Sequence, residues 1–340
     1  MIGTFASLVA LAGVIAGCGT TSNSPNPTNS GASPTTGTGA LAGSASEKYE
    51  MVTFLSGIDY WKGAYKGMQD AAKLFGVTTV YTGASNYDIN QEVTVLNQVI
   101  AQKPAGILLT CINPDALKPS IDKAISEGIP VVTFDSDSPD SNRYSFLATS
   151  NYEAGVIAAD TLAKLTGGTG DVAILVTPGQ LNLQQRAQGF TDTIKQKYPN
   201  MHIVAVENGK ENQIQSASVT SAILSAHPNL VGIFGTDANA GVGIATAIKE
   251  ANKVGKVHIV SFDTDKATLD LVKSGVIDAT LAQGTWNMGY WGMQFLFELH
   301  HNLLHPVSDW KAAHIPPLPP NVDTGVSVVT KQNVDFYYSN

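Results

Sequence analysis

The chain has 340 residues, of which 43% are hydrophobic, and its 28 acidic residues outnumber its 20 lysines and arginines. A chain of this length and hydrophobicity can bury the cores of one or two α/β domains. The net charge of −8 argues against a nucleic-acid partner, because binding to phosphates depends largely on Lys and Arg. No dense basic run occurs in the sequence to offset that charge.

The chain begins with an apolar run over residues 2–16 that ends in Ile15-Ala16-Gly17-Cys18. The run has the length of a signal-peptide core and is shorter than the roughly 20 residues that span a bilayer as a helix. The tetrapeptide resembles a bacterial lipobox, which predicts a lipoprotein signal peptide over residues 1–17 and lipid attachment at Cys18. The alternative is an ordinary buried cysteine after an apolar strand, and the basic residues expected before such a run are missing.

Residues 19–46 contain only Gly, Thr, Ser, Asn, Pro, Ala and one Leu. Such a composition cannot bury enough apolar surface to fold, so residues 18–46 are predicted to be a disordered tether that carries the lipidated Cys18. A flexible chain of this length spans on the order of 30 Å. Cys111 is the remaining cysteine and cannot form a disulfide within the chain, and we expect it to be a small buried residue.

From Tyr49 onward, short β-branched runs alternate with longer amphipathic stretches, which is typical of parallel βαβ units. Helices are expected between the strands, as in the helical spacing of apolar residues over residues 64–75. Strands are predicted at residues 51–55, 77–81, 106–110, 130–134, 171–176, 202–206, 231–235, 257–262 and 278–282.

The sequences of the predicted strands contain an internal repeat. Residues 105–110 (AGILLT) parallel residues 231–236 (VGIFGT), and residues 134–137 (FDSD) parallel residues 262–265 (FDTD). A duplication would give two similar doubly wound halves, each with an acid, Asp135 or Asp263, at a strand end. Parallel sheets bind ligands at their carboxyl ends, so the two acids are expected to face a shared cleft. The alternative is chance similarity between buried strands.

Several short motifs follow the predicted strands in a defined order. Together they resemble the periplasmic sugar-binding proteins of the ribose-binding type, relatives of the ligand domain in lactose-repressor-like regulators, over residues 48–306. The residues that carry the resemblance are Tyr60-Trp61, Ile112-Asn113-Pro114, Phe134-Asp135, Arg186-Ala187-Gln188-Gly189-Phe190, Thr236-Asp237, Ser261-Phe262-Asp263 and Ala282-Gln283.

The resemblance implies the type I periplasmic binding protein fold, an α/β architecture with two doubly wound parallel-sheet (Rossmann-like) lobes joined by a three-crossing hinge. It places the crossings near Thr149, Gly284 and Pro306. The expected lobes are residues 47–149 plus 285–306 and residues 150–284 plus 307–340. The segment 322–334 is expected to supply a closing strand.

One departure from the family pattern affects the expected ligand. Where ribose binders show Asp-Arg, this chain has Asp135-Ser136-Asp137, which removes a guanidinium. This acidic version, together with Asp237-Ala238-Asn239, is more similar to the rhamnose and autoinducer-2 receptors of the superfamily. The expected ligand is therefore a monosaccharide or a similar small polyol.

A sugar offers hydroxyl groups that donate and accept at its rim and C–H faces above and below. Carboxylates such as Asp135 and Asp263 accept hydroxyl protons, Arg186 supplies a planar set of donors, and the rings of Tyr60 and Trp61 can lie against a sugar face. The alternatives are helix capping for the acids, helix packing for the aromatic pair and a solvated helix face or an ion pair for Arg186. The predicted ligand-binding set is Tyr60, Trp61, Asn113, Asp135, Ser136, Asp137, Arg186, Asp237, Asn239, Asp263 and Gln283.

Other candidate metal, cofactor and catalytic motifs are incomplete. His301 and His305 have the spacing of a metal pair next to His300, but no Glu or Cys completes the set. Gly241-Val242-Gly243 follows a strand as a dinucleotide loop does, yet Thr246 replaces the third glycine. No nucleophile elbow or zinc-protease motif occurs, so we expect no cofactor, no metal and no enzymatic activity.

The sequence thus predicts an extracytoplasmic solute-binding protein, anchored through the Cys18 lipid, that closes on a sugar and delivers it to an ABC-type permease. It is expected to act as a monomer without a nucleic-acid partner. Three alternatives stay open: a receptor that passes a sugar-like signal to a sensor, a sugar-responsive regulator and a sugar-converting enzyme.

Overall fold

The computed structural model of the chain describes residues 41–338. The predicted signal peptide, Cys18 and most of the predicted tether lie outside the described residues. No helix within residues 41–338 is long and apolar enough to cross a membrane.

The last residues of the predicted tether are not disordered as expected. The Gly43 N–H donates to the Phe75 carbonyl at 2.7 Å, and the Thr78 hydroxyl donates to the Ala45 carbonyl at 2.8 Å. A Cβ atom on Gly43 would lie 2.4 Å from a methyl group of Val77, so the segment comes this close because it has no side chain there. Residues 43–46 therefore belong to the folded body.

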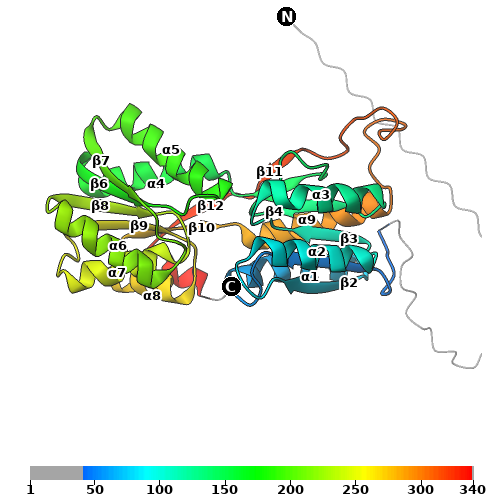
Figure 1. Cartoon of the computed structure of the whole chain (residues 1–340), viewed down its shortest axis with the longest axis horizontal. Coiled ribbons are helices and arrows are strands. Elements are labelled where there is room, and N and C mark those ends of the chain that lie inside the picture. The colour runs from blue at the N-terminus through cyan, green and yellow to red at the C-terminus, as the bar shows by residue number, and fades with distance from the viewer. Residues whose placement is uncertain (1–40, 339–340) are drawn as a thin grey trace, which may run out of the picture. The chain divides into compact units, whose positions relative to one another are not determined.

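The first of two sheets has the strand order β11-β5-β4-β3-β1-β2, and all of its pairs are parallel. We call it, with its helices, the N-terminal lobe. Helices α1 and α9 pack together on one face and α2 and α3 on the other (Figure 1). The elements are β1 (Lys48–Thr53), α1 (Tyr60–Phe75), β2 (Thr78–Gly83), α2 (Ile89–Ala101), β3 (Gly106–Leu109), α3 (Pro114–Ser126), β4 (Val131–Phe134), β5 (Phe146–Ala148), α9 (Thr285–His300) and β11 (Asn321–Asp323).

The second sheet has the order β12-β10-β9-β8-β6-β7, and only β12 is antiparallel to its neighbour. We call it, with its helices, the C-terminal lobe. Helices α4 and α5 cover one face, and α6, α7 and α8 cover the other (Figure 1). The elements are α4 (Asn151–Thr166), β6 (Thr169–Leu175), α5 (Leu181–Lys197), β7 (Asn200–Glu207), α6 (Gln213–Ala226), β8 (Leu230–Gly235), α7 (Ala240–Glu250), β9 (His258–Phe262), α8 (Lys266–Ser274), β10 (Ala279–Gln283), β12 (Val326–Thr330) and the 3₁₀ helix η1 (Val334–Tyr337).

The predicted fold class is confirmed, because both sheets are predominantly parallel and carry helices on both faces. Each of the nine predicted strands overlaps a strand of the structure. The sequence missed β5 and β11, because strands of only three residues are too short to give a recognisable pattern of polar and apolar side chains. Cys111 is buried in the apolar core of the N-terminal lobe, as expected.

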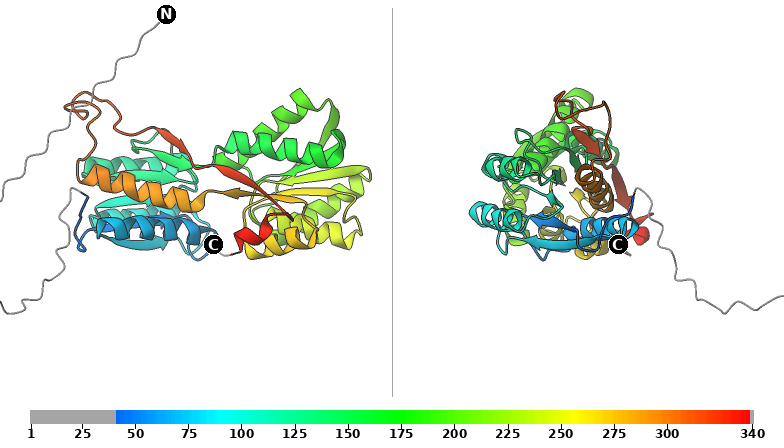
Figure 2. Two further views of the ribbon diagram at one scale, coloured as in Figure 1. Left: turned by 180° about the vertical axis from the view of Figure 1, so that it is seen from behind. Right: turned by 90° about the vertical axis from the view of Figure 1, so that its right-hand side faces the viewer.

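Three segments pass between the two sheets (Figure 2). Two pass after β5, at Thr149, and after β10, at Gly284. The expectation of a third crossing near Pro306 is wrong, because β11 still pairs with β5 of the N-terminal lobe. The chain crosses only at Thr324 and Gly325, so residues 307–323 do not belong to the C-terminal lobe. Backbone hydrogen bonding at the free edge of β5 holds this segment, and the Phe146 N–H donates to the Pro320 carbonyl.

The same close packing of two helices occurs in both lobes. A Cβ atom on Gly289 of α9 would lie 1.7 Å from the Ala64 carbonyl oxygen of α1, and one on Gly189 of α5 would lie 2.0 Å from the Tyr152 carbonyl oxygen of α4. Neither position can hold a side chain without moving a backbone. Figure 2 shows α9 and α1 side by side in the N-terminal lobe. The structural repeat therefore extends beyond the strand motifs that revealed it.

Candidate binding site

A pocket with a cavity volume of about 260 Å³ is lined by residues of both lobes, and we call it the central pocket. Its walls come from loops and helix starts that follow the carboxyl ends of parallel strands, where α/β sheets bind ligands. The N-terminal lobe contributes Phe54, Leu55, Ile58, Tyr60, Trp61, Tyr87 and Asp135. The C-terminal lobe contributes Thr177, Gln180, Asn182, Leu183, Arg186, Lys210, Glu211, Asp237, Ala238, Asn239, Asp263 and Gln283.

The two repeated acids adopt the same unusual backbone conformation. Asp135 follows β4 with φ of 60°, and Asp263 follows β9 with φ of 69°. The left-handed region is uncommon for residues other than glycine, and Asp is among those that tolerate it. The N–H of Asp135 donates to the Leu147 carbonyl at 3.1 Å, and that of Asp263 to the Leu281 carbonyl at 2.8 Å. The repeated Phe-Asp motif therefore builds one turn twice and places a carboxylate from each lobe in the central pocket.

Asp135 is buried and accepts a hydrogen bond of 2.6 Å from the Tyr60 hydroxyl. Burial raises the pKa of this carboxyl, although the Tyr60 hydrogen bond and the Arg186 charge act in the opposite direction. Tyr60 begins α1 in the N-terminal lobe, so Asp135 is oriented from within its own lobe.

Asp263 is also buried and accepts a hydrogen bond of 2.9 Å from the Gln283 amide. Burial raises the pKa of Asp263 to about 7, with Arg186 partly offsetting the rise. A carboxyl group with this pKa exchanges its proton near neutral pH. Ligand binding can therefore be coupled to proton release at this residue.

Arg186 lies on α5 and is only 2% exposed, which excludes the alternative of a solvated helix face. Its guanidinium donates to the Asn151 side chain, the Thr236 carbonyl and the Gln283 side chain, each at 2.9 Å, and lies 3.9 Å from the centre of the Phe262 ring. A guanidinium has five N–H donors, so two remain for a ligand. The group is held rigidly in the pocket wall.

Trp61 packs mainly in the core of the N-terminal lobe. It is 1% exposed, its indole N–H donates to the Leu55 carbonyl at 2.7 Å, and its ring lies edge-on to Phe54 and Phe134. It still lines the central pocket together with Tyr60, whose ring centre is 4.7 Å away. The two rings form an apolar wall opposite the polar groups of the C-terminal lobe.

Three residues of the predicted set do not line the central pocket. Asn113 caps α3 by accepting from the Ala116 N–H at 2.9 Å, and Ser136 is buried behind the turn that Asp135 makes. Asp137 forms a buried ion pair with Arg143 at 2.6 Å. Arg143, which lies six residues after Asp137 in the chain, therefore supplies a guanidinium to Asp137.

Of the two predicted residues at the start of α7, Asp237 caps the helix with its side chain and Asn239 does not. Asp237 accepts from the N–H groups of Asn239 and Ala240, while its other carboxylate oxygen is buried with no partner within the described residues. Asn239 accepts from the Gln213 side chain at 3.2 Å. Both residues line the central pocket, so capping and pocket lining occur together in Asp237.

Sequence reasoning missed a polar bridge between the lobes. The Gln180 amide donates to the Tyr87 hydroxyl of the N-terminal lobe and to the Glu211 carboxylate at 2.6 Å. Burial raises the pKa of Glu211 to about 7, and the Asp237 charge adds to the rise. All three residues lie outside the strand-end motifs and within two residues before the start of a helix, where no periodic pattern marks them.

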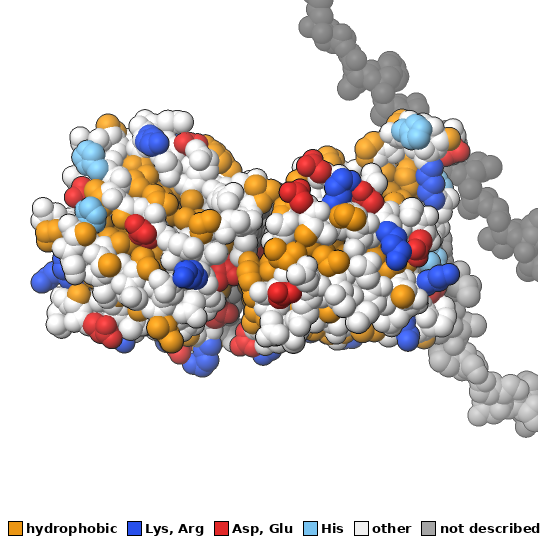
Figure 3. Space-filling view, viewed as in Figure 1, with side chains coloured by type: hydrophobic (Ala, Val, Ile, Leu, Met, Phe, Trp, Pro, Cys, Tyr) orange, Lys and Arg blue, Asp and Glu red, His pale blue; other side chains and the backbone are white. Residues whose placement is uncertain are grey.

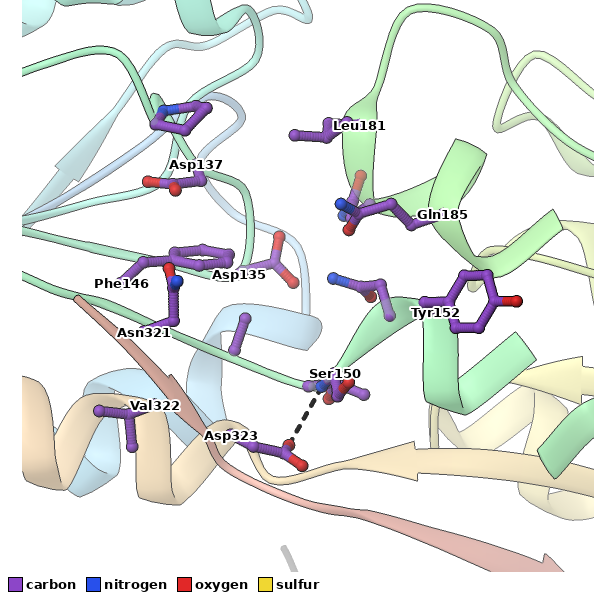
Figure 4. A pocket seen from close by; sticks show the side chains of 15 residues that line it. Asp135, Asp137, Phe146, Ser150, Tyr152, Leu181, Gln185, Asn321, Val322 and Asp323 are labelled. Atoms are coloured by element: carbon purple, nitrogen blue, oxygen red, sulfur yellow. Dashed lines mark hydrogen bonds between the residues drawn. The ribbon is translucent and has the colours of Figure 1, made fainter. Parts of the chain in front are cut away.

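A second pocket, of about 490 Å³, lies on the side of the three crossings and shares Asp135 and Asn182 with the central pocket. Figure 4 shows Asp135, Asp137 and Phe146 on one side and Leu181, Gln185 and Tyr152 on the other. Asp323, at the third crossing, accepts from the Ser150 N–H of the first crossing at 3.1 Å (Figure 4). The crossings are therefore coupled to each other beside this pocket.

The charges of the central pocket favour a ligand rich in hydroxyl groups. Asp135, Asp237, Asp263 and Glu211 outnumber the cations Arg186 and Lys210, which is unfavourable for a phosphorylated ligand. On the face shown in Figure 3, Lys and Arg side chains are scattered over both lobes, which is consistent with the sequence-based argument against nucleic acid.

A model of the periplasmic binding protein domain matches residues 50–301. The chain belongs to the periplasmic binding protein family. Among curated proteins, it is 24% identical to the xylose/arabinose-binding protein of Sulfolobus acidocaldarius over 80% of this chain and 68% of that protein. It is 25% identical to the D-allose-binding periplasmic protein of Escherichia coli over 75% of this chain and 85% of that protein.

Solved structures give stronger matches. A sugar-binding protein of a sugar ABC transporter from Bacillus halodurans is 50% identical, with a TM-score of 0.83 over 86% of this chain and 100% of that chain. AraP, an arabinose-binding protein from Geobacillus stearothermophilus, is 55% identical, with a TM-score of 0.79 over 86% and 99%. A chain of the XylFII–LytSN complex is 28% identical, with a TM-score of 0.73 over 84% and 98%.

Proposed function

We propose that this protein captures a monosaccharide, or a similar small polyol, in the central pocket outside the cytoplasm and delivers it to an ABC-type permease. The observation that carries the proposal is the pairing of Asp135 and Asp263, one carboxylate from each lobe, in one pocket with Arg186. The relatives named above, which bind arabinose, xylose or allose, support a sugar as the ligand.

Each wall of the pocket suits one part of a sugar. The two carboxylates accept hydroxyl protons in charge-assisted hydrogen bonds, and the two remaining donors of Arg186 reach hydroxyl or ring oxygens. The rings of Tyr60 and Trp61, which meet edge to face, offer apolar surface for the C–H groups of the sugar. Because the groups come from both lobes, binding favours the arrangement in which the lobes close on the ligand.

The bound sugar leaves the pocket chemically unchanged in this proposal. The relatives are named as binding proteins, which supports a role in capture rather than conversion. Attachment through the lipid on Cys18 and a monomeric state complete the proposal. The lipobox resemblance supports the first, and the second follows from a site that one chain completes.

The XylFII–LytSN complex, in which a neighbour of this fold is found together with a second protein, supports a second candidate: the sugar-bound protein docks on a partner other than a permease, such as a sensor. The two roles give different phenotypes when the gene is deleted. Loss of uptake of radiolabelled sugar indicates transport. Retained uptake with loss of sugar-induced transcription indicates sensing.

The direct test is isothermal titration calorimetry of the purified protein with L-arabinose, D-xylose, D-ribose, D-allose, L-rhamnose, xylitol and autoinducer-2. At least one compound is expected to bind at one site per chain, and a ligand at a hundredfold excess over its Kd should add about 2.7 kcal/mol to the free energy of unfolding. The ligand should be recovered unaltered after long incubation. Turnover, or no binding of any compound, would contradict the proposal.

A further inference from the structure

A cluster of metal-ligating side chains lies outside the central pocket. Glu47, His300 and His301 each offer one ligand atom, and these atoms all lie within 4.8 Å of one another. Glu47 directly precedes β1, His300 ends α9 and His301 is the residue after that helix. The sequence-based expectation that no acid completes this histidine set fails because Glu47 lies 254 positions away from His301 in the chain and beside it in the fold.

The three side chains are held by contacts outside the cluster. The His301 ring lies 4.1 Å from the ring of Phe297, one turn earlier on α9, and Phe297 stacks on Phe75 at 4.1 Å. His300 lies edge-on to Tyr49, with ring centres 6.0 Å apart. Contacts of this kind fix the orientation of metal ligands before a metal binds.

Glu47 is oriented by the short segment that enters the folded body. Its Oε1 accepts from the Ser44 N–H at 2.8 Å, and its Oε2 lies 2.8 Å from His301 Nε2. The contact to His301 is a hydrogen bond or ion pair in which a proton occupies the space between the two atoms. A tetrahedral zinc ion with bonds near 2.0–2.1 Å separates its ligand atoms by roughly 3.4 Å, so an ion could replace that proton after a shift of about half an ångström.

One further property of the location favours a cation. The cluster lies at the carboxyl end of α9, a helix of 16 residues, where the last carbonyl groups give the helix its negative end.

From this juxtaposition we infer that Glu47, His300 and His301 form a binding site for one divalent late transition-metal ion, with Zn²⁺ the expected occupant. Imidazole and carboxylate together suit zinc, nickel and copper, whereas calcium and magnesium prefer sites made of oxygen ligands alone. Three protein ligands leave a position for water. The ion would connect the start of β1 to the end of α9.

The site shares no residue with the central pocket, so metal binding is expected to stabilise the N-terminal lobe without changing sugar affinity. In Figure 1 the start of the described chain reaches the end of the N-terminal lobe at which α9 finishes. The ion would thus stabilise the point at which the preceding segment joins the folded body.

The test is titration of tag-free, chelator-treated full-length protein with ZnCl₂ in a calorimeter, accompanied by thermal unfolding with and without Zn²⁺. We expect one ion per chain and a higher Tm with zinc. Glu47→Gln and the double variant His300→Ala/His301→Ala should each weaken zinc binding at least tenfold and remove most of the Tm increase. His227→Ala, at the end of α6 in the other lobe, is the matched control and should change neither.

Other outcomes overturn the inference. Zinc binding that survives in the double histidine variant, or that disappears with His305→Ala but not with Glu47→Gln, would assign the ion to an exposed histidine instead. A normal far-UV circular dichroism spectrum for each variant separates lost ligation from lost folding. Co²⁺ provides a second readout, because tetrahedral coordination gives strong visible absorption that Glu47→Gln should reduce. No zinc binding by the parent protein would contradict the site outright.

Discussion

The two lobes use one backbone design for different chemistry. In both lobes a central strand is followed by the Asp of a Phe-Asp motif, and this Asp has a left-handed backbone conformation. In both lobes two helices also pack closely where one of them has a glycine. The N-terminal lobe surrounds its acid with aromatic side chains, whereas the C-terminal lobe surrounds its acid with Arg186, Gln283 and further polar groups. The repeat therefore fixes where a carboxylate stands, and the surrounding side chains decide what it can recognise.

This division suggests that the C-terminal lobe selects the pattern of hydroxyl groups and the N-terminal lobe supplies the surface on which the ring rests. Asp263 depends on Gln283, which Arg186 also binds, so three residues of the C-terminal lobe act as a connected group. Asp135 depends on a single hydroxyl, that of Tyr60. Changes in the C-terminal lobe should consequently have the larger effects.

The largest effect is expected for Arg186→Lys. A lysine cannot reproduce the planar donors that hold Asn151, the Thr236 carbonyl and Gln283, so these groups lose partners and the ligand loses two donors. Calorimetry should show a loss of sugar affinity of about 100-fold or more, or roughly 3 kcal/mol. The control is Arg143→Lys, which removes another buried guanidinium that pairs with Asp137 outside the central pocket. Equal losses of affinity in both variants would contradict the assignment of Arg186 to the ligand.

Replacing the paired acids tests whether both lobes bind the ligand. Asp263→Asn should weaken sugar binding by about 30-fold and Asp135→Asn by about tenfold, because in each case a charge-assisted hydrogen bond becomes a neutral one in a buried site. Asp137→Asn, a change next to the same turn but outside the central pocket, should leave affinity within about threefold of the parent protein. An effect confined to one lobe would mean that the ligand does not bridge the two.

The raised pKa of Asp263, about 7, predicts a pH-dependent affinity. Sugar hydroxyls donate to the ionised carboxylate, so affinity should rise from about pH 5 to pH 7, by at most tenfold per pH unit, and level off by about pH 8. The stability of the ligand-free protein should change with pH in the opposite direction. The folded state holds the Asp263 proton more tightly than the unfolded state does, so the free energy of unfolding falls as pH rises from about 4 to 7.

Calorimetry across this pH range checks the prediction. Asp263→Asn should flatten the rise in affinity more than Glu211→Gln does, although burial raises the pKa of Glu211 to about 7 as well. A profile that is flat in the parent protein would show that Asp263 accepts no hydroxyl proton.

The smallest effect is expected in the aromatic wall. Tyr60→Phe keeps the ring and removes the hydroxyl that orients Asp135, so affinity should fall by about fivefold, or roughly 1 kcal/mol. Tyr65→Phe, which removes a hydroxyl on the same helix that donates to the Thr79 carbonyl, is the matched control and should leave affinity unchanged. A loss as large as that of Arg186→Lys would reverse the proposed ranking of the lobes.

The sequence predicted the parts of the site that depend on strand ends. Asp135 and Asp263 were identified because two nearly identical motifs end buried strands, and the backbone geometry of parallel sheets places such ends at one edge. The polar bridge of Tyr87, Gln180 and Glu211 could not be predicted, because these residues meet only through folding and no pattern of hydrophobicity marks them.

The predicted boundary between the lobes was wrong for a related reason. The strand β11 has three residues and follows a proline-rich stretch, so its pairing with β5 leaves no periodic signal in the sequence. Asp137 shows a different limit of sequence-based prediction. A buried acid beside a binding motif can pair with an arginine as well as with a ligand, and here its partner is Arg143, which lies in a loop. Local motifs indicate which groups are available, and the fold decides which of them share a pocket.

The most direct test of the central claim is a crystal structure of the protein with the tightest-binding sugar of the calorimetric panel. We expect the sugar in the central pocket, with its hydroxyl groups within hydrogen-bond distance of both Asp135 and Asp263 and of Arg186. A sugar bound to one lobe alone, or located in the pocket beside the three crossings, would contradict it.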